Sequence, residues 1–192
     1  MIKRLDDLNH LPGQRPVTWR RERTPYAALA CLAGAAWPPL VLTMLIWPPS
    51  NWLPGPEMDW RLLVLLIGLV ATPAGLMAIK LERESSGRPT GRLGIVWRFM
   101  LYGGLLAAAL MALYTLLAVV NGWFASGGLA QALGASETNV LIYGVGGLPI
   151  AMIVGVSYAL WAGLCVAFIA FQPEPPAVKD RIGMLDKAPP AP

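Results

Sequence analysis

Four long apolar runs, separated by polar or turn-rich segments, dominate the hydrophobic pattern of this chain. They cover residues 25–47, 62–79, 99–120 and 140–171, and none of them contains Asp, Glu, Lys, Arg or His. A bilayer core of about 30 Å needs about 20 helical residues per crossing. A helix in a soluble protein carries a polar face, and these runs carry none, so lipid or other apolar helices must surround them. The pattern predicts an all-α membrane protein with four transmembrane helices, together spanning residues 25–171.

Two of the four runs are irregular. Pro38 and Pro39 interrupt the first run and predict a kink within a single crossing, because each proline removes one backbone donor. The fourth run has 32 residues and would be about 48 Å long as a helix. We expect it to tilt, to extend beyond the membrane core, or to begin with a short piece that ends in a break near Pro149.

The basic residues are distributed very unevenly among the segments between the runs. Residues 1–24 hold six of them, residues 80–98 hold five and residues 172–192 hold three, whereas the other two connections share only Arg61. By the positive-inside rule, both termini and the middle connection face the cytoplasm. This bias accounts for the net charge of +4, so we expect no nucleic-acid partner. We expect the inner (plasma) membrane of a bacterium, and an organelle membrane stays open as an alternative.

The polar segments predict loops and tails. Residues 1–24 are expected to form a polar cytoplasmic tail, and the proline-rich residues 172–192 a disordered one. Residues 121–139 are expected to form an outer loop, with Ser136 or Thr138 capping the fourth helix. The other outer loop contains Trp47, Trp52 and Trp60, which suit the headgroup boundary. There, Glu57, Asp59 and Arg61 form either a small polar cluster or an ordinary solvated loop.

The fourth run carries a small residue at every fourth position. The members of this small-residue stripe are Gly147, Ala151, Gly155, Ala159, Gly163 and Ala167. Small side chains let two membrane helices approach closely, so the stripe predicts a helix-packing surface. Six positions are more than one helix crossing needs. Part of the stripe could therefore meet a further helix, from the same chain or from a partner subunit.

The inventory of reactive side chains is poor. His10 is the one histidine and lies in the N-terminal tail, so the chain alone offers neither a bis-histidine haem nor a multi-histidine metal site. The apolar runs contain no carboxylate pair for proton transfer. Cys31 and Cys165 lie within apolar runs, where a role as small apolar residues is favoured. Thr72 directly precedes Pro73, and its hydroxyl could bond the carbonyl that this proline releases. We expect no catalytic residue, no cofactor and no bound metal.

These features favour a non-catalytic membrane protein that acts as an accessory or assembly subunit of a larger complex, for example in secretion or conjugation, transport or respiration. Its expected partners are membrane lipids and other membrane protein subunits, or further copies of itself. Immunity to a pore-forming toxin would need the same lateral helix contacts. The alternative is a small transporter component or channel without intramembrane charges, lined by backbone carbonyls at the proline breaks. An enzyme using Arg83, Arg88 and Arg92 with Glu82 and Glu84 is the least favoured interpretation.

Overall fold

The computed structural model describes residues 17–20, 23–53, 58–86, 91–125 and 128–173, and these are mostly helical. The elements in chain order are β1 (Val17–Trp19), α2 (Arg23–Ala35), α3 (Pro38–Ile46), α4 (Trp60–Ser86), α5 (Arg92–Ala125), α6 (Leu129–Asn139), the π-helical η1 (Val140–Gly147), α7 (Leu148–Cys165), the π-helical η2 (Val166–Ala170) and β2 (Phe171–Pro173). Three helical stretches of the described residues are long and apolar enough to cross a membrane, or four if α2 and α3 count as one bent span.

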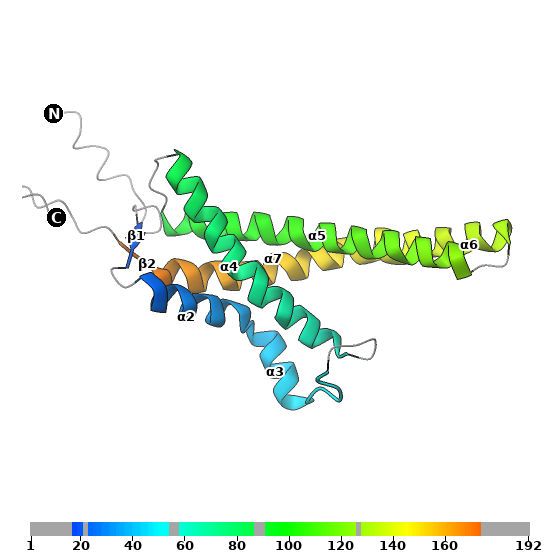
Figure 1. Ribbon diagram of the computed structural model, residues 1–192, viewed down its shortest axis with the longest axis horizontal. Coiled ribbons are helices and arrows are strands. Elements are labelled where there is room, and N and C mark those ends of the chain that lie inside the picture. Colours follow the sequence, from blue (N-terminus) through cyan, green and yellow to red (C-terminus); the bar gives the residue numbers. More distant parts are fainter. Residues whose placement is uncertain (1–16, 21–22, 54–57, 87–90, 126–127, 174–192) are drawn as a thin grey trace, which may run out of the picture.

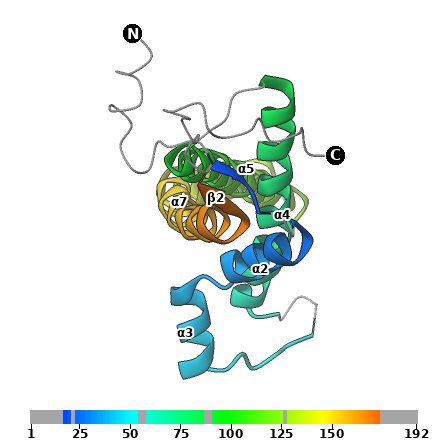
Figure 2. The same ribbon diagram turned by 90° about the vertical axis from the view of Figure 1, so that its left-hand side faces the viewer.

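The helices form a long hairpin that is crossed by shorter ones at one end. Figure 1 shows α5 running antiparallel to the continuous helical stretch from α6 to η2. Figure 2, viewed along the hairpin, shows α2 and α4 on one flank of it, with α3 bent away. The far part of the hairpin, made by the end of α5 with α6 and η1, projects beyond the crossing helices (Figure 1). The contacts of α6 and η1 lie almost wholly within the hairpin.

The first apolar run is divided into α2 and α3 by a bend of 60°. Pro38 and Pro39 form the first turn of α3, where a missing backbone donor costs little. The expected kink at these prolines is therefore present, and it is sharp enough to make two helices.

The fourth run is not broken near Pro149, and the helix is longer than the sequence pattern predicted. It continues from Leu129 to Ala170, and Pro149 lies in the first turn of α7, directly after the wider turns of η1. The predicted outer loop at 121–139 is also wrong, because α5 extends to Ala125 and α6 begins at Leu129. Ser136 and Thr138 lie inside α6 and do not cap the helix; Thr138 Oγ1 donates to the carbonyl oxygen of Gly134.

Two short strands, which the sequence pattern did not predict, accompany the helices. β1 and β2 pair in antiparallel register, with Val17 opposite Pro173 and Trp19 opposite Phe171. The two strands thus bring part of each predicted tail to the same end of the bundle, where α4 ends and α5 begins (Figure 1). We call this pair the terminal clasp. The remainder of the tails, residues 1–16 with His10 and residues 174–192, lies outside the described residues.

The buried core lies at the clasp end of the hairpin. Its members come from both strands and from α2, α4, α5, α7 and η2, and the largest fully buried side chains are Ile79, Ile95, Val166 and Phe171. Trp19 packs on the Phe171 ring with centroids 4.3 Å apart. The clasp therefore closes the core at the point where the polypeptide enters and leaves the bundle.

Candidate functional site

The small-residue stripe of α7 lies against α5 of the same chain. A methyl group added at Gly155 would lie 2.4 Å from Ala107 Cβ and 3.0 Å from the carbonyl oxygen of Gly103. One added at Gly103 would lie 2.2 Å from Ala159 Cβ. The two backbones are thus as close as side chains allow, which gives many dispersion contacts where lipid provides no hydrophobic drive for helices to associate.

The contact with α5 follows the stripe for about four turns. It runs from Gly163, which packs on Val96 and Phe99, to Gly147, which packs on Met111. A single crossing was expected to diverge sooner, but α5 carries its own small residues opposite the stripe. Ala151 is partly exposed on the same line, and Ala167 is fully buried in the core. The stripe is therefore occupied within the chain.

Side chains from α7 cover the backbone at the break between α2 and α3. Trp161 Nε1 donates to the carbonyl oxygen of Ala33 at 2.9 Å, and the Tyr158 hydroxyl donates to that of Ala35. The amide of Trp37 has moved from the regular helical acceptor Ala33 to Ala35. Carbonyls left without regular helical partners are costly in an apolar medium. Two aromatic residues of α7 thus satisfy them and fix α2 to the hairpin.

Thr72 behaves differently from the sequence expectation. Its hydroxyl donates at 2.8 Å to the carbonyl oxygen of Gly68, four residues earlier, and the side chain is 2% exposed. The carbonyl released by Pro73 is that of Leu69, so Thr72 does not serve it. Thr72 instead satisfies its own hydroxyl within α4 while its methyl group packs on the Gly34 position of α2.

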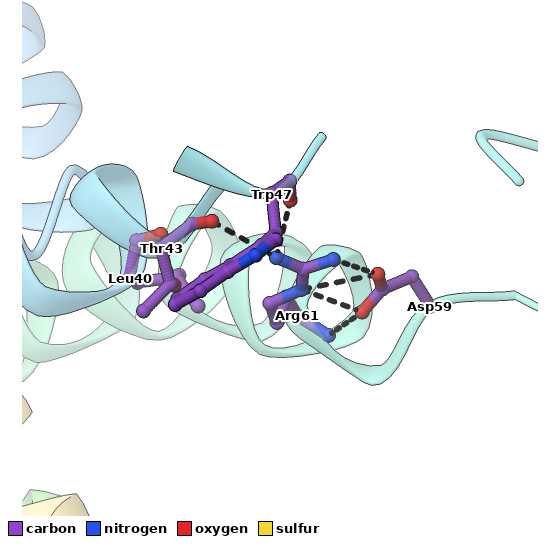
Figure 3. A network of polar contacts seen from close by, with 5 residues as sticks. All are labelled: Leu40, Thr43, Trp47, Asp59 and Arg61. Atoms are coloured by element: carbon purple, nitrogen blue, oxygen red, sulfur yellow. Dashed lines mark hydrogen bonds and ion pairs between the residues drawn. The ribbon is translucent and has the colours of Figure 1, made fainter. Parts of the chain in front are cut away.

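Arg61 forms a polar network between the end of α3 and the start of α4 (Figure 3). Its guanidinium pairs with the Asp59 carboxylate, and its Nη1 donates to the carbonyl oxygens of Thr43 at 3.1 Å and Trp47 at 2.6 Å. Thr43 lies in the last turn of α3, where its carbonyl also accepts the Trp47 amide, and Trp47 directly follows the helix. Arg61 thus adds a second donor at Thr43 and supplies one to the Trp47 carbonyl. Arg61 thus ties the end of α3 to the start of α4. Glu57 lies outside the described residues.

The Arg61 network borders an open cavity of about 500 Å³, which Ser50, Met58 and Trp60 also line. The side chains of Arg61 and Asp59 are only 14% and 12% exposed. Hydrogen bonds from Arg61 lower the pKa of Asp59 below its ordinary value of 3.8. Asp59 and Arg61, the described members of the polar cluster that the sequence offered for this loop, are paired in the structure.

Arginines surround the terminal clasp. Arg83 donates to the carbonyl oxygen of Val17 at 2.5 Å and lies over the Phe171 ring, 4.9 Å from its centroid. Arg98 pairs with Glu82 at 2.6 Å. Arg20 and Arg92 both approach Phe168, as described below. Sequence reasoning used these arginines for orientation and for a little-favoured active site. The contacts of Arg83 with the Phe171 ring and of Arg92 with the Phe168 ring were missed, because η2 and β2 were expected to be membrane span and tail.

The face of α5 turned away from α7 carries a second regular pattern. Large apolar residues alternate at spacings of four and three, and each is at least 40% exposed: Leu106, Leu110, Leu113, Leu117, Val120 and Phe124. We call this set the leucine stripe. Such a 4-3 repeat keeps one seam facing a partner helix in a coiled coil. It was readable in the sequence but was passed over in favour of the small-residue stripe.

Both cysteines, Cys31 and Cys165, are free thiols and partly exposed. Among the described residues, no three His, Cys, Asp or Glu side chains are grouped as metal ligands.

Comparison of the chain with known protein families, curated proteins and solved structures finds no match.

Proposed function

We propose that this chain is a non-catalytic accessory or assembly subunit of a larger membrane complex, with both termini in the cytoplasm of a bacterial cell. It would associate through the leucine stripe of α5 with a helix of another membrane protein, or of a second copy of itself. Its clasp end, which gathers the arginines, would face the cytoplasm as the positive-inside rule requires.

The observation that carries the proposal is the low coverage of α5. Only 6% of its most apolar 18-residue window is buried, compared with 28% for α4 and 28% for the helix that contains α7. Lipid could cover any apolar surface, but lipid does not require a heptad repeat. A helix partner does, because knobs at spacings of three and four fill holes on a facing helix.

The environment of the proline break favours a subunit over the channel alternative. A channel of this composition would line its pore with released carbonyls. In this structure, the carbonyls of Ala33 and Ala35 accept hydrogen bonds from Trp161 and Tyr158. They are therefore engaged inside the protein, and the channel alternative would need other polar groups.

The experiment is purification of the tagged chain from its host in a gentle detergent, with identification of the membrane proteins that co-migrate. The test variant Leu113→Ala/Leu117→Ala shortens two members of the leucine stripe. The matched control Leu105→Ala/Leu116→Ala changes two leucines of α5 that are as exposed but lie off the stripe. Both variants keep apolar side chains, so membrane insertion is preserved in each.

We expect specific partners to co-migrate with the wild type and the control and to be lost from the stripe variant. Equal retention in both variants would contradict docking through the stripe. A monomer in every sample would contradict the subunit function itself, and solute flux into vesicles would then test the channel alternative.

A further inference from the structure

Two arginines from distant parts of the chain converge on Phe168 of η2. Arg20, which follows β1, donates from Nη2 to the carbonyl oxygen of Phe168 at 3.4 Å. Arg92, the first residue of α5, places its guanidinium over the ring of the same residue, 4.5 Å from the centroid. The terminal clasp and the start of α5 therefore each bring one guanidinium group to Phe168, Arg20 to its backbone carbonyl and Arg92 to its ring.

Each guanidinium group keeps donors that no acceptor among the described residues serves, although Arg20 also lies over the Tyr26 ring, 4.7 Å from its centroid. The Nε atoms of Arg20 and Arg92 are buried, and neither has a hydrogen-bond partner among the described residues. The bond from Arg20 to Phe168 is long, and a guanidinium has five N–H donors to satisfy. Of the α4 carboxylates, Glu82 pairs with Arg98 through Oε1, and Glu84 pairs with Lys80. Within the described part of the chain neither arginine is paired with a carboxylate, so the two charges can accept an anion from outside it.

The surroundings indicate what kind of anion this is. The arginines lie where the apolar spans end, which is the level of the lipid headgroups. In the same first turns of α5, Gly91, Leu93, Gly94 and Trp97 line an open cavity of about 400 Å³ that neither arginine lines, and Trp97 is 65% exposed, as suits a ring at the membrane interface. The first turn of α5 contains no acidic residue, so its positive dipole end adds to the field of the arginines.

We infer that Arg20 and Arg92 form a binding site for the phosphate of an anionic phospholipid headgroup. A phosphodiester offers several oxygen acceptors to two planar guanidinium forks, which bind phosphate in a bidentate manner. The acyl chains of such a lipid would lie along the apolar faces of α5 and α7. This site is independent of the leucine stripe, so it stands or falls separately from the proposed partner interface.

The test is binding of short-chain phosphatidylglycerol, compared with phosphatidylcholine and inorganic phosphate, to the full chain in a neutral detergent. Tryptophan fluorescence follows the titration, and circular dichroism checks that each variant is folded. The variants are Arg92→Gln, Arg20→Gln/Arg92→Gln and Arg92→Lys. The matched control is Lys80→Gln, which removes one charge at the same end from an exposed ion pair.

We expect the wild type to prefer phosphatidylglycerol and Arg92→Gln to bind it about fivefold more weakly. The double variant should lose about 25-fold on the same basis, and Arg92→Lys should fall between the wild type and Arg92→Gln. Lys80→Gln should bind as the wild type does. If the double variant does not fold, the wild-type preference and the single variants decide.

Three results would overturn the inference. One is a wild type that binds both lipids equally. Another is an equal loss in Lys80→Gln and Arg92→Gln, which would reduce the effect to overall charge. The third is inorganic phosphate binding as tightly as the lipid, which would assign the site to a free anion.

Discussion

Replacement of Gly155 by alanine should destabilise the hairpin without removing any polar contact. The added methyl group would lie 2.4 Å from Ala107 Cβ and 3.0 Å from the carbonyl oxygen of Gly103. Carbon atoms pack best at about 3.5–4.0 Å, so α5 and α7 would have to separate by roughly 1 Å at this level. Overpacking of this kind costs about 1–3 kcal/mol, or about 5- to 150-fold in the unfolding equilibrium constant.

The assay is reversible unfolding of the purified protein in mixed micelles of a mild detergent and dodecyl sulfate, followed by circular dichroism. The matched control is Gly144→Ala, whose methyl group would lie 3.7 Å from Thr115 Cγ2, an ordinary contact. We expect that control to unfold at the wild-type midpoint or slightly later, because alanine favours a helix over glycine by about 1 kcal/mol in water.

A second change separates the close contact from other effects of the substitution. Ala107→Gly in the Gly155→Ala background removes the nearer of the two clashes and leaves the Gly103 carbonyl in place. We expect partial recovery, measured as a coupling energy between the two positions. A Gly155→Ala protein as stable as the wild type would refute the close approach of α5 and α7 and return the small-residue stripe to lipid or a partner.

Two further predictions concern the ends of α3. Trp161→Phe should cost about 1–2 kcal/mol of stability, because among the described residues the indole is the donor to the Ala33 carbonyl. Tyr158→Phe should cost less, because the Ala35 carbonyl that it serves also accepts the backbone amide of Trp37. The same unfolding assay in micelles compares the two variants. Because hydrogen bonds from Arg61 lower the pKa of Asp59, the network should hold α3 at and above the ordinary aspartate pKa and release it as the pH falls through the lowered value. Distances between spin labels on α3 and α4 measure this, and a pH response that persists in Asp59→Asn would contradict the mechanism.

The sequence predicted the long apolar helices and missed how their ends continue. The runs 62–79 and 99–120 lie inside α4 and α5, because an uncharged stretch of that length has few alternatives to a helix in lipid. The end of α5 at Ala125 and the start of α6 at Leu129 were missed because Gly, Ser and Asn in this part of the sequence are typical of turns. In the structure, polar side chains of this region form hydrogen bonds within the hairpin. Trp123 Nε1 donates to Ser136 Oγ, and the Asn139 side chain donates to the Ala118 carbonyl.

The polar contacts were less accessible to sequence reasoning. The spacing of Asp59 and Arg61 indicates that the two could pair. The hydrogen bond from Arg61 to α3, however, depends on the 60° bend between α2 and α3, and the prolines do not specify the size of that bend. Likewise, nothing local indicates that Trp161 serves Ala33, because that bond joins residues far apart in the chain. The pairing of Val17 with Pro173 is also a long-range event between two strands of three residues each, and such short segments carry little strand signal even though Val, Thr and Trp favour strands.

The terminal clasp also imposes an order on biosynthesis. Trp19 emerges from the ribosome early, whereas its partner Phe171 emerges only after every apolar span has been made. At ordinary rates of translation, on the order of 10 s pass between the synthesis of β1 and the synthesis of β2. During that interval the core residues around Val17 and Trp19 are incomplete, because Phe171 has not yet been made. A nascent chain that stops before Phe171 therefore leaves this end open, and the closing of the clasp marks a protein whose last helix has reached its place.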